Sequence, residues 1–156
     1  MSAASGTNNR VLPNAYSIDD LQAEPSHTGW DGVRNYQARN MLRDQIKQGD
    51  QVFFYHSNCA EPGIVGIMQV VNESYIDDTA FDPTEYYYDP KSDPEKPRWY
   101  QVDVQFVRRL QRTISLRELK TYTDDQLLGM PLVRKGNRLS VMPVTEAQWH
   151  FILGLE

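Results

Sequence analysis

Residues 30–43 read Trp-Asp-Gly-Val-Arg-Asn-Tyr-Gln-Ala-Arg-Asn-Met-Leu-Arg, and the rest of the chain is organised around the helix that they predict. An apolar stripe recurs at helical spacing: Ala38, Met41, Leu42 and Ile46. It predicts an amphipathic helix over residues 33–48, ended by Gly49. The polar face carries forked donors and carboxamides: Arg34, Asn35, Gln37, Arg39, Asn40 and Arg43. With the flat rings of Trp30 and Tyr36, such groups recognise planar hydrogen-bonding ligands, and the alternative is a solvated face without a ligand.

The composition is typical of a folded protein with one domain. The chain has 156 residues, of which 40% are hydrophobic and 24% charged. We expect residues 10–156 to form that domain, and residues 1–9, which are small and polar, to be a mobile or non-native leader. No apolar run is long enough to span a bilayer and the start lacks a signal region, so we expect a cytosolic protein.

The charge is unevenly distributed. The formal net charge of -5 argues against strong non-specific binding of nucleic acid, because such binding requires many Lys and Arg side chains. Acidic side chains gather in residues 73–95, however, and basic ones in residues 98–138. Together with the basic residues of the polar helix, residues 98–138 could form a positive surface that faces one target.

Four segments rich in strand-forming residues predict a sheet: residues 51–57, 64–71, 98–110 and 139–144. Alternation in the first places Val52, Phe54 and His56 on one face and Phe53, Tyr55 and Ser57 on the other. Gly66 indicates a bulge or a close backbone approach, with a ligand as one candidate neighbour. Capping residues predict short helices that begin near Ser17, Ser115, Asp124 and Thr145. Between the strands, residues 75–97 combine prolines with tyrosines and predict an ordered loop.

Signals for catalysis are weak, and we expect no enzyme. A strand places His56 and Cys59 on opposite faces, which disfavours a thiol–imidazole dyad. The three histidines lack the spacing of a metal site, and the acidic residues near position 90 lack the glycine and the spacing of a calcium loop. No glycine-rich phosphate loop is present, so we expect no cofactor.

Eight motifs in order resemble those of the EVE domain family: residues 30–40, 54–59, 62–66, 80–83, 88–92, 97–104, 129–133 and 138–144. The resemblance covers residues 16–152. It implies an α+β, PUA-like pseudo-barrel, in which flanking helices cover a curved, mostly antiparallel sheet, in the superfamily that also contains YTH and SRA-type readers. It also implies a non-catalytic module that holds a modified nucleobase, such as methylated cytosine, in a cage-like pocket.

The start of the chain departs from the family pattern. Where the family has an apolar strand, residues 8–13 read Asn-Asn-Arg-Val-Leu-Pro, which keeps Pro13 and places Arg10 at the position of a family lysine. The preceding residues Thr7, Asn8 and Asn9 are poor strand formers, so we expect strand pairing before Arg10 to be short or absent.

The polar helix and the end of the strand over residues 51–57 together predict the site. Its ligand-binding residues would be Trp30, Asn35, Tyr36, Arg39, His56 and Ser57. Arg10 and Arg138 would contact phosphates, and the partner would be DNA or RNA with a modified base, not a membrane or a metal. One alternative is a module that binds a small molecule or a protein in the same pocket. For single residues, the alternative is structural: Trp30 fills the core, while Asn35 and Ser57 cap backbone groups.

Overall fold

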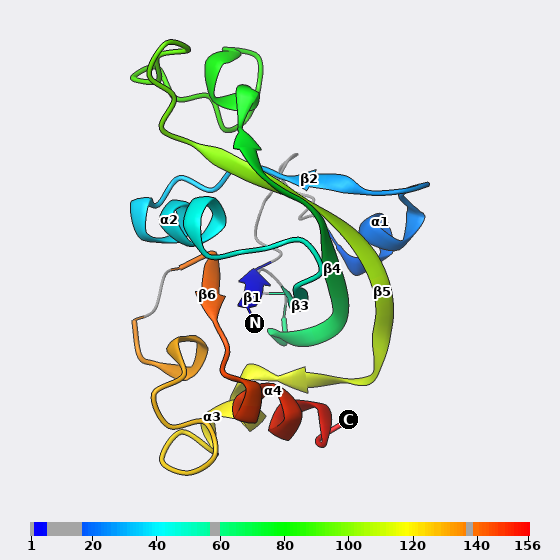
Figure 1. Cartoon of the computed structure of the whole chain (residues 1–156). Coiled ribbons are helices and arrows are strands. Elements are labelled where there is room, and N and C mark those ends of the chain that lie inside the picture. Colours follow the sequence, from blue (N-terminus) through cyan, green and yellow to red (C-terminus); the bar gives the residue numbers. More distant parts are fainter. Residues whose placement is uncertain (1, 6–16, 57–59, 137–138) are drawn as a thin grey trace.

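The structure, a computed structural model, describes residues 2–5, 17–56, 60–136 and 139–156. One sheet of six strands runs through it in the order β2-β5-β4-β3-β1-β6 (Figure 1). The strands are β1 (Ser2–Ser5), β2 (Thr28–Trp30), β3 (Gln51–His56), β4 (Gly63–Ile76), β5 (Tyr100–Ser115) and β6 (Val141–Pro143). Only β1 and β3 pair in parallel, and the other neighbours are antiparallel. The predicted α+β fold with a curved, mostly antiparallel sheet is confirmed, although the sheet is not a closed barrel.

The helices are short: α1 (Ile18–Ala23), α2 (Tyr36–Asp44), α3 (Leu116–Lys120) and α4 (Glu146–Leu153), with 3-10 turns η1 (Asp78–Phe81) and η2 (Pro131–Val133). Ser17, Ser115 and Thr145 cap α1, α3 and α4, as their sequences predict. Reciprocal capping occurs in α1 and α4, whereas the Glu118 carboxylate pairs with Arg112 instead. The helix predicted near Asp124 is wrong, because residues 121–129 form successive turns.

Helix α2 is the amphipathic helix predicted over residues 33–48, but it is shorter at both ends. It starts at Tyr36 because the Asn35 side chain accepts a hydrogen bond from the backbone of Ala38 and caps the helix. Its buried residues are Ala38, Met41 and Leu42, which belong to the apolar stripe. They pack against the sheet, so the helix lies across it as predicted.

Two apolar clusters use alternate side chains of the same strands. Val52 and Phe54 join the cluster covered by α1 and α2, whereas Phe53 and Tyr55 join the cluster covered by α4. In the second cluster, the Phe53 ring stacks on Trp149 with centroids 3.8 Å apart. The alternation predicted for β3 is therefore confirmed for these four residues, and it separates the two faces of the sheet.

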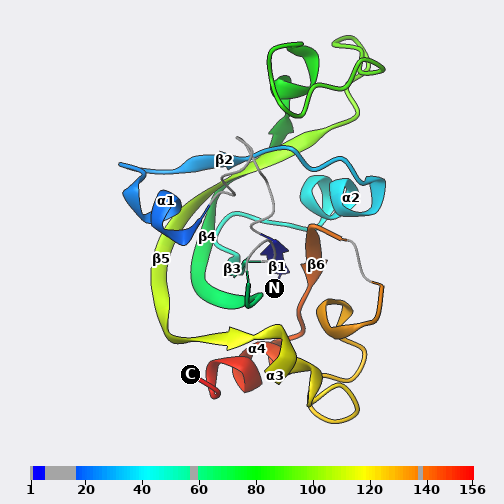
Figure 2. The ribbon, with the colours of Figure 1, turned by 180° about the vertical axis from the view of Figure 1, so that it is seen from behind.

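The two longest strands, β4 and β5, curve together around the molecule (Figures 1 and 2). Their pairing shifts register at several places, and such irregularities bend and twist a ladder. Gly66 lies at one of them, and a Cβ built there would be 2.2 Å from Ile18 Cδ1. The close neighbour predicted for Gly66 is thus a side chain of α1 and not a ligand.

Two strands differ from the sequence-based expectation. Strand β2 was not predicted, and Ser2–Ser5 form the short strand β1 within the segment expected to be a mobile or non-native leader with short strand pairing or none. The backbone of β1 pairs in parallel with β3 on one side and antiparallel with β6 on the other. Position 1 and positions 6–9 lie outside the described residues, and the division into a leader and a domain stays a prediction.

Residues 77–99 form a lobe that projects beyond the sheet where β4 passes into β5 (Figure 2). Side chains of Asp82, Asp89 and Asp93 accept hydrogen bonds from backbone amides two residues further on, which orders successive turns. The ordered loop predicted for this region is confirmed. Across the part of the chain that the structure describes, no helix combines the length and apolar character needed to cross a bilayer.

Candidate functional site

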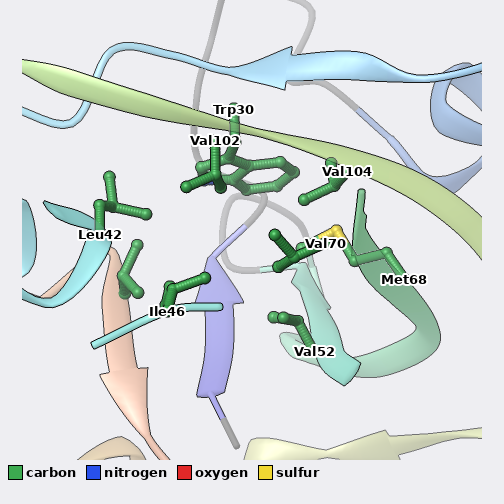
Figure 3. Close-up of a pocket in the computed structure, with 9 residues that line it drawn as sticks. Trp30, Leu42, Ile46, Val52, Met68, Val70, Val102 and Val104 are labelled. Atoms are coloured by element: carbon green, nitrogen blue, oxygen red, sulfur yellow. The ribbon is translucent and has the colours of Figure 1, made fainter. Parts of the chain in front are cut away.

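Strand β2 places Trp30 inside the molecule. Its side chain is 3% exposed, and its ring meets the Phe54 ring edge-on with centroids 5.6 Å apart. A cavity of about 10 Å³ lies beside it (Figure 3) and is lined by Trp30, Leu42, Ile46, Val52, Met68, Val70, Val102, Val104 and Val141. This volume suits at most one water molecule, and a nucleobase does not fit. In this geometry Trp30 is a core residue.

His56 continues the same row of rings toward the end of β3. Its ring centroid lies 5.6 Å from that of Phe54, and the side chain is partly buried. Burial lowers the pKa of His56, while the carboxylates of Asp19 and Asp20 act in the opposite direction. Because the lowered pKa leaves the imidazole neutral at pH 7, one ring nitrogen can donate a hydrogen bond and the other can accept one. The row of Trp30, Phe54 and His56 thus runs from the core to the end of β3. There the His56 imidazole has the chemistry to form a hydrogen bond with the edge of a base.

Tyr36 lies outside this row, at the start of α2. It is 52% exposed, and its ring stacks on Trp99 with centroids 4.9 Å apart. The Arg39 guanidinium carbon lies 4.9 Å from the Tyr36 ring centroid, and Arg98 donates to the Tyr36 hydroxyl at 3.3 Å. Tyr36 and Arg39 therefore belong to a cluster at the surface, which includes Arg98 and Trp99.

Arg34 connects the lobe of residues 77–99 to the start of α2 through an ion pair and hydrogen bonds. Its guanidinium lies 2.8 Å from the carboxylate of Asp77, which is fully buried, and it also donates to the carbonyl oxygen of Tyr87. The Asp77 carboxylate further accepts hydrogen bonds from the backbone of Gly32 and from Thr79. The lobe is thus joined to the residue that precedes the cap of α2 by an ion pair whose carboxylate is buried.

Carboxylates neutralise most of the arginines in the predicted basic stretch. The pairs are Arg108 with Glu156, Arg109 with Asp19, Arg112 with Glu118 and Arg117 with Glu61. Arg43 of the polar helix pairs with Asp44. Salt bridges of this kind reduce the positive potential of a surface, so these four arginines of the basic stretch contribute less to the expected target-facing surface than their charges suggest. Within the described ranges, no group of three His, Cys, Asp or Glu side chains is placed to hold a metal ion.

The structure thus divides the residues predicted for the site. Trp30 and His56 both contact Phe54, whereas Asn35 caps α2 and Tyr36 packs with Arg39. Arg10, Ser57 and Arg138 lie outside the described residues. The sequence-based prediction missed Arg98, Trp99 and Asp77. Of these, only Trp99 had a local signal, because the alternation over residues 98–110 predicted it on the face opposite to the apolar residues, although β5 begins only at Tyr100.

A comparison with known families identifies the domain. A model of the EVE domain matches residues 10–155. The chain belongs to the EVE domain family. This agrees with the resemblance found from its motifs, and it places the cluster around Tyr36 and the row ending at His56 within one EVE domain.

Relatives of this EVE domain chain occur in animals and fungi. Thymocyte nuclear protein 1 of Mus musculus is 52% identical over 148 residues, which are 90% of this chain and 65% of the mouse protein. The Homo sapiens protein of the same name is 50% identical over 148 residues, with the same coverage. The chain therefore spans somewhat less than two thirds of these relatives.

Solved structures share this EVE fold. A protein from Pseudomonas syringae is 46% identical with a TM-score of 0.89, covering 99% of this chain and 97% of that one. Human THYN1 protein, solved in complex with 5-methylcytosine containing DNA, is 44% identical with a TM-score of 0.87, covering 99% and 95% of the two chains.

Proposed function

We propose that this protein binds DNA through a modified base, with 5-methylcytosine as the first candidate, and that it acts by recognition without chemistry. The observation that carries the proposal is the human THYN1 complex with 5-methylcytosine containing DNA, because the two chains share 44% identity over nearly their whole length. With a TM-score of 0.87, the two chains also share the same fold.

The row of rings supports a base-binding role for the end of β3. A base removed from the DNA stack needs apolar or aromatic surface and directed hydrogen bonds to its edge. In the proposal, the side chains of His56 and Ser57 form hydrogen bonds with the edge of the base. Phe54 packs against the imidazole of His56, and Trp30 packs against Phe54 in the core. Asn35 holds the start of α2 in place, and Arg10 and Arg138 are proposed phosphate contacts.

A binding screen tests the proposal. Matched oligonucleotides with one cytosine, 5-methylcytosine or 5-hydroxymethylcytosine, as single strands, duplexes and RNA, would be titrated by fluorescence anisotropy. We expect one modified form to bind about tenfold more tightly than the unmodified form, since burying one methyl group is worth ~1 kcal/mol or more. Equal affinity for all bases would contradict base reading, and salt-independent binding of a free small molecule would favour the alternative module.

Histidine variants locate the site. We expect His56→Ala to lose most of the preference for the modified base, because the imidazole is the partly buried polar end of the row. His150→Ala is the matched control, since that side chain is 66% exposed on α4. Circular dichroism checks that both variants fold. If His56→Ala keeps the parent's preference, the base does not contact this end of β3.

The absence of chemistry is tested separately. The proposal predicts that oligonucleotides recovered after prolonged incubation with the protein have the same mass and base composition as before. Conversion or excision of the modified base, detected by mass spectrometry, would make the protein an enzyme and overturn this part of the proposal.

A further inference from the structure

Two guanidinium groups converge on the exposed ring of Tyr36. Arg39 of α2 packs over the ring, with its guanidinium carbon 4.9 Å from the ring centroid. Arg98, which precedes β5, approaches from the lobe and donates to the hydroxyl. Trp99 stacks on the ring and limits its movement. We call Tyr36, Arg39, Arg98 and Trp99 the Tyr36 cluster.

Uncharged acceptors hold both arginines of the Tyr36 cluster. Arg39 donates to the carbonyl oxygen of Arg98 at 2.7 Å and to the side-chain oxygen of Asn40 at 2.8 Å. Arg98 donates to the carbonyl oxygen of Lys91 at 2.7 Å. These contacts fix the guanidinium groups without cancelling their charge, in contrast to Arg43 one turn along the same helix, which pairs with Asp44.

Two carboxylates lie near the Tyr36 cluster: the charge of Arg39 acts on Asp44, which pairs with Arg43, and the charge of Arg98 acts on Asp89. Asp89 accepts from the Trp99 indole at 2.6 Å and from the backbone of Lys91. The indole hydrogen bond and, less strongly, the charge of Arg98 hold the pKa of Asp89 below its usual range. Asp89 therefore orients Trp99 and offsets the charge of Arg98 only in part.

The arrangement has the chemistry of a phosphodiester contact. Two like charges fixed close together repel each other, and an anion that bridges them is attracted by both. The planar fork of arginine matches the paired oxygens of a phosphate, and the half-exposed Tyr36 ring offers a face to an adjacent sugar or base. Tyr36 is the first residue of α2, and the buried residues of this helix belong to the same apolar cluster as Trp30 and Phe54.

We propose that the Tyr36 cluster binds the phosphodiester backbone of the DNA that carries the recognised base. This inference rests on the proposed function and assigns Tyr36 and Arg39 to the backbone and not to the base itself. Arg98, which the sequence did not single out, becomes the second phosphate contact.

Charge-removing variants test the inference. Arg39→Gln, Arg98→Gln and the double variant would be titrated with modified and unmodified oligonucleotides over a range of salt concentrations, with Arg43→Gln as the control on the same helix. We expect each cluster variant to weaken both oligonucleotides about threefold to tenfold, to leave their affinity ratio unchanged, and to lower the salt dependence by nearly one counterion. Arg43→Gln should match the parent.

Each other outcome is informative. Cluster variants that bind like the parent with the same salt dependence would overturn the inference, and so would a changed affinity ratio, since that would place Arg39 or Arg98 at the base. If the parent binds no oligonucleotide, the proposed function fails first. Inorganic phosphate in the low millimolar range is the competitor that separates a free-anion site from a backbone contact, and full displacement by it would contradict the inference. Thermal unfolding confirms that the variants are folded.

Discussion

At the scale of single residues, Trp30 combines a position beside the proposed site with a role in the core. Trp30→Ala should lower the free energy of unfolding by about 3 to 5 kcal/mol, because the ring fills space between Phe54 and the cavity. Trp30→Phe should cost less than half as much, since most of the apolar volume remains. Urea unfolding measures both. Equal stability of Trp30→Ala and the parent would show that the ring is not packed as described. Because Trp30→Phe should destabilise the protein less than Trp30→Ala, it is the better variant for measuring how Trp30 affects binding.

His56 provides a second test at this scale. Its lowered pKa predicts an NMR titration midpoint below the ordinary histidine value of 6.5. The unfolded chain then takes up a proton before the folded protein does, so the stability contributed by neutral His56 is present above pH 6.5 and is lost as the pH falls through the lowered pKa. His56→Gln should remove that part of the pH dependence. A midpoint at or above 6.5 would mean that the ring is more solvated, or more strongly influenced by Asp19 and Asp20, than its burial indicates.

At the scale of elements, the ion pair of Arg34 with the buried Asp77 couples the start of α2 to the lobe of residues 77–99. Arg34→Gln should lower the free energy of unfolding by about 3 kcal/mol or more, because it leaves the fully buried Asp77 carboxylate without its cation. Arg43→Gln should change stability by less than about 1 kcal/mol, since its partner Asp44 is exposed. Hydrogen exchange in the lobe should rise in the first variant only. Similar stability of the two variants would contradict the coupling.

The elements also show what the sequence alone can predict. Helices α1 and α4 and strand β3 carry their own signals in capping residues and alternation, so their positions follow from local sequence. Strands β1 and β2 are short, and their pairing partners are distant in sequence. Nothing local marks them, since the partner supplies most of the stabilisation.

The candidate site follows the same rule. The stripe of α2 and the alternation of β3 predicted which polar residues lie at the start of the helix and at the end of the strand. The sequence did not predict that Tyr36 contacts Arg98, 62 positions away, or that Arg34 forms an ion pair with Asp77. Such contacts depend on how the lobe is placed against the start of α2. They separate Tyr36 from the row of rings containing Trp30.

At the scale of the whole molecule, the pair of Arg108 and Glu156 ties the last residue of the sequence to β5. Two hydrogen bonds from Arg108 and one from the backbone of Gln111 lower the pKa of Glu156 from 4.5 to about 2. The stability that they contribute is present above pH 4.5 and is lost as the pH falls to about 2. Glu156→Gln should lower the free energy of unfolding by about 1 kcal/mol at pH 7, since Arg108 is partly exposed, and by almost nothing at pH 2. Denaturant unfolding at both values measures this, and an unchanged difference between them would contradict it.

The place of β1 between β3 and β6 has a consequence for the order in which the molecule assembles. Within the described part of the sheet, β6 is joined to the other strands only through β1, and the two come from opposite ends of the sequence. Closing a loop of almost the full chain length is entropically unfavourable and slow compared with forming the local β4–β5 hairpin. We therefore expect the hairpin to form early in refolding and the β1–β6 edge to form last. Among the strands of this sheet, β1 is synthesised first and β6 last, so β1 remains without one of its two partners until the other strands have been made.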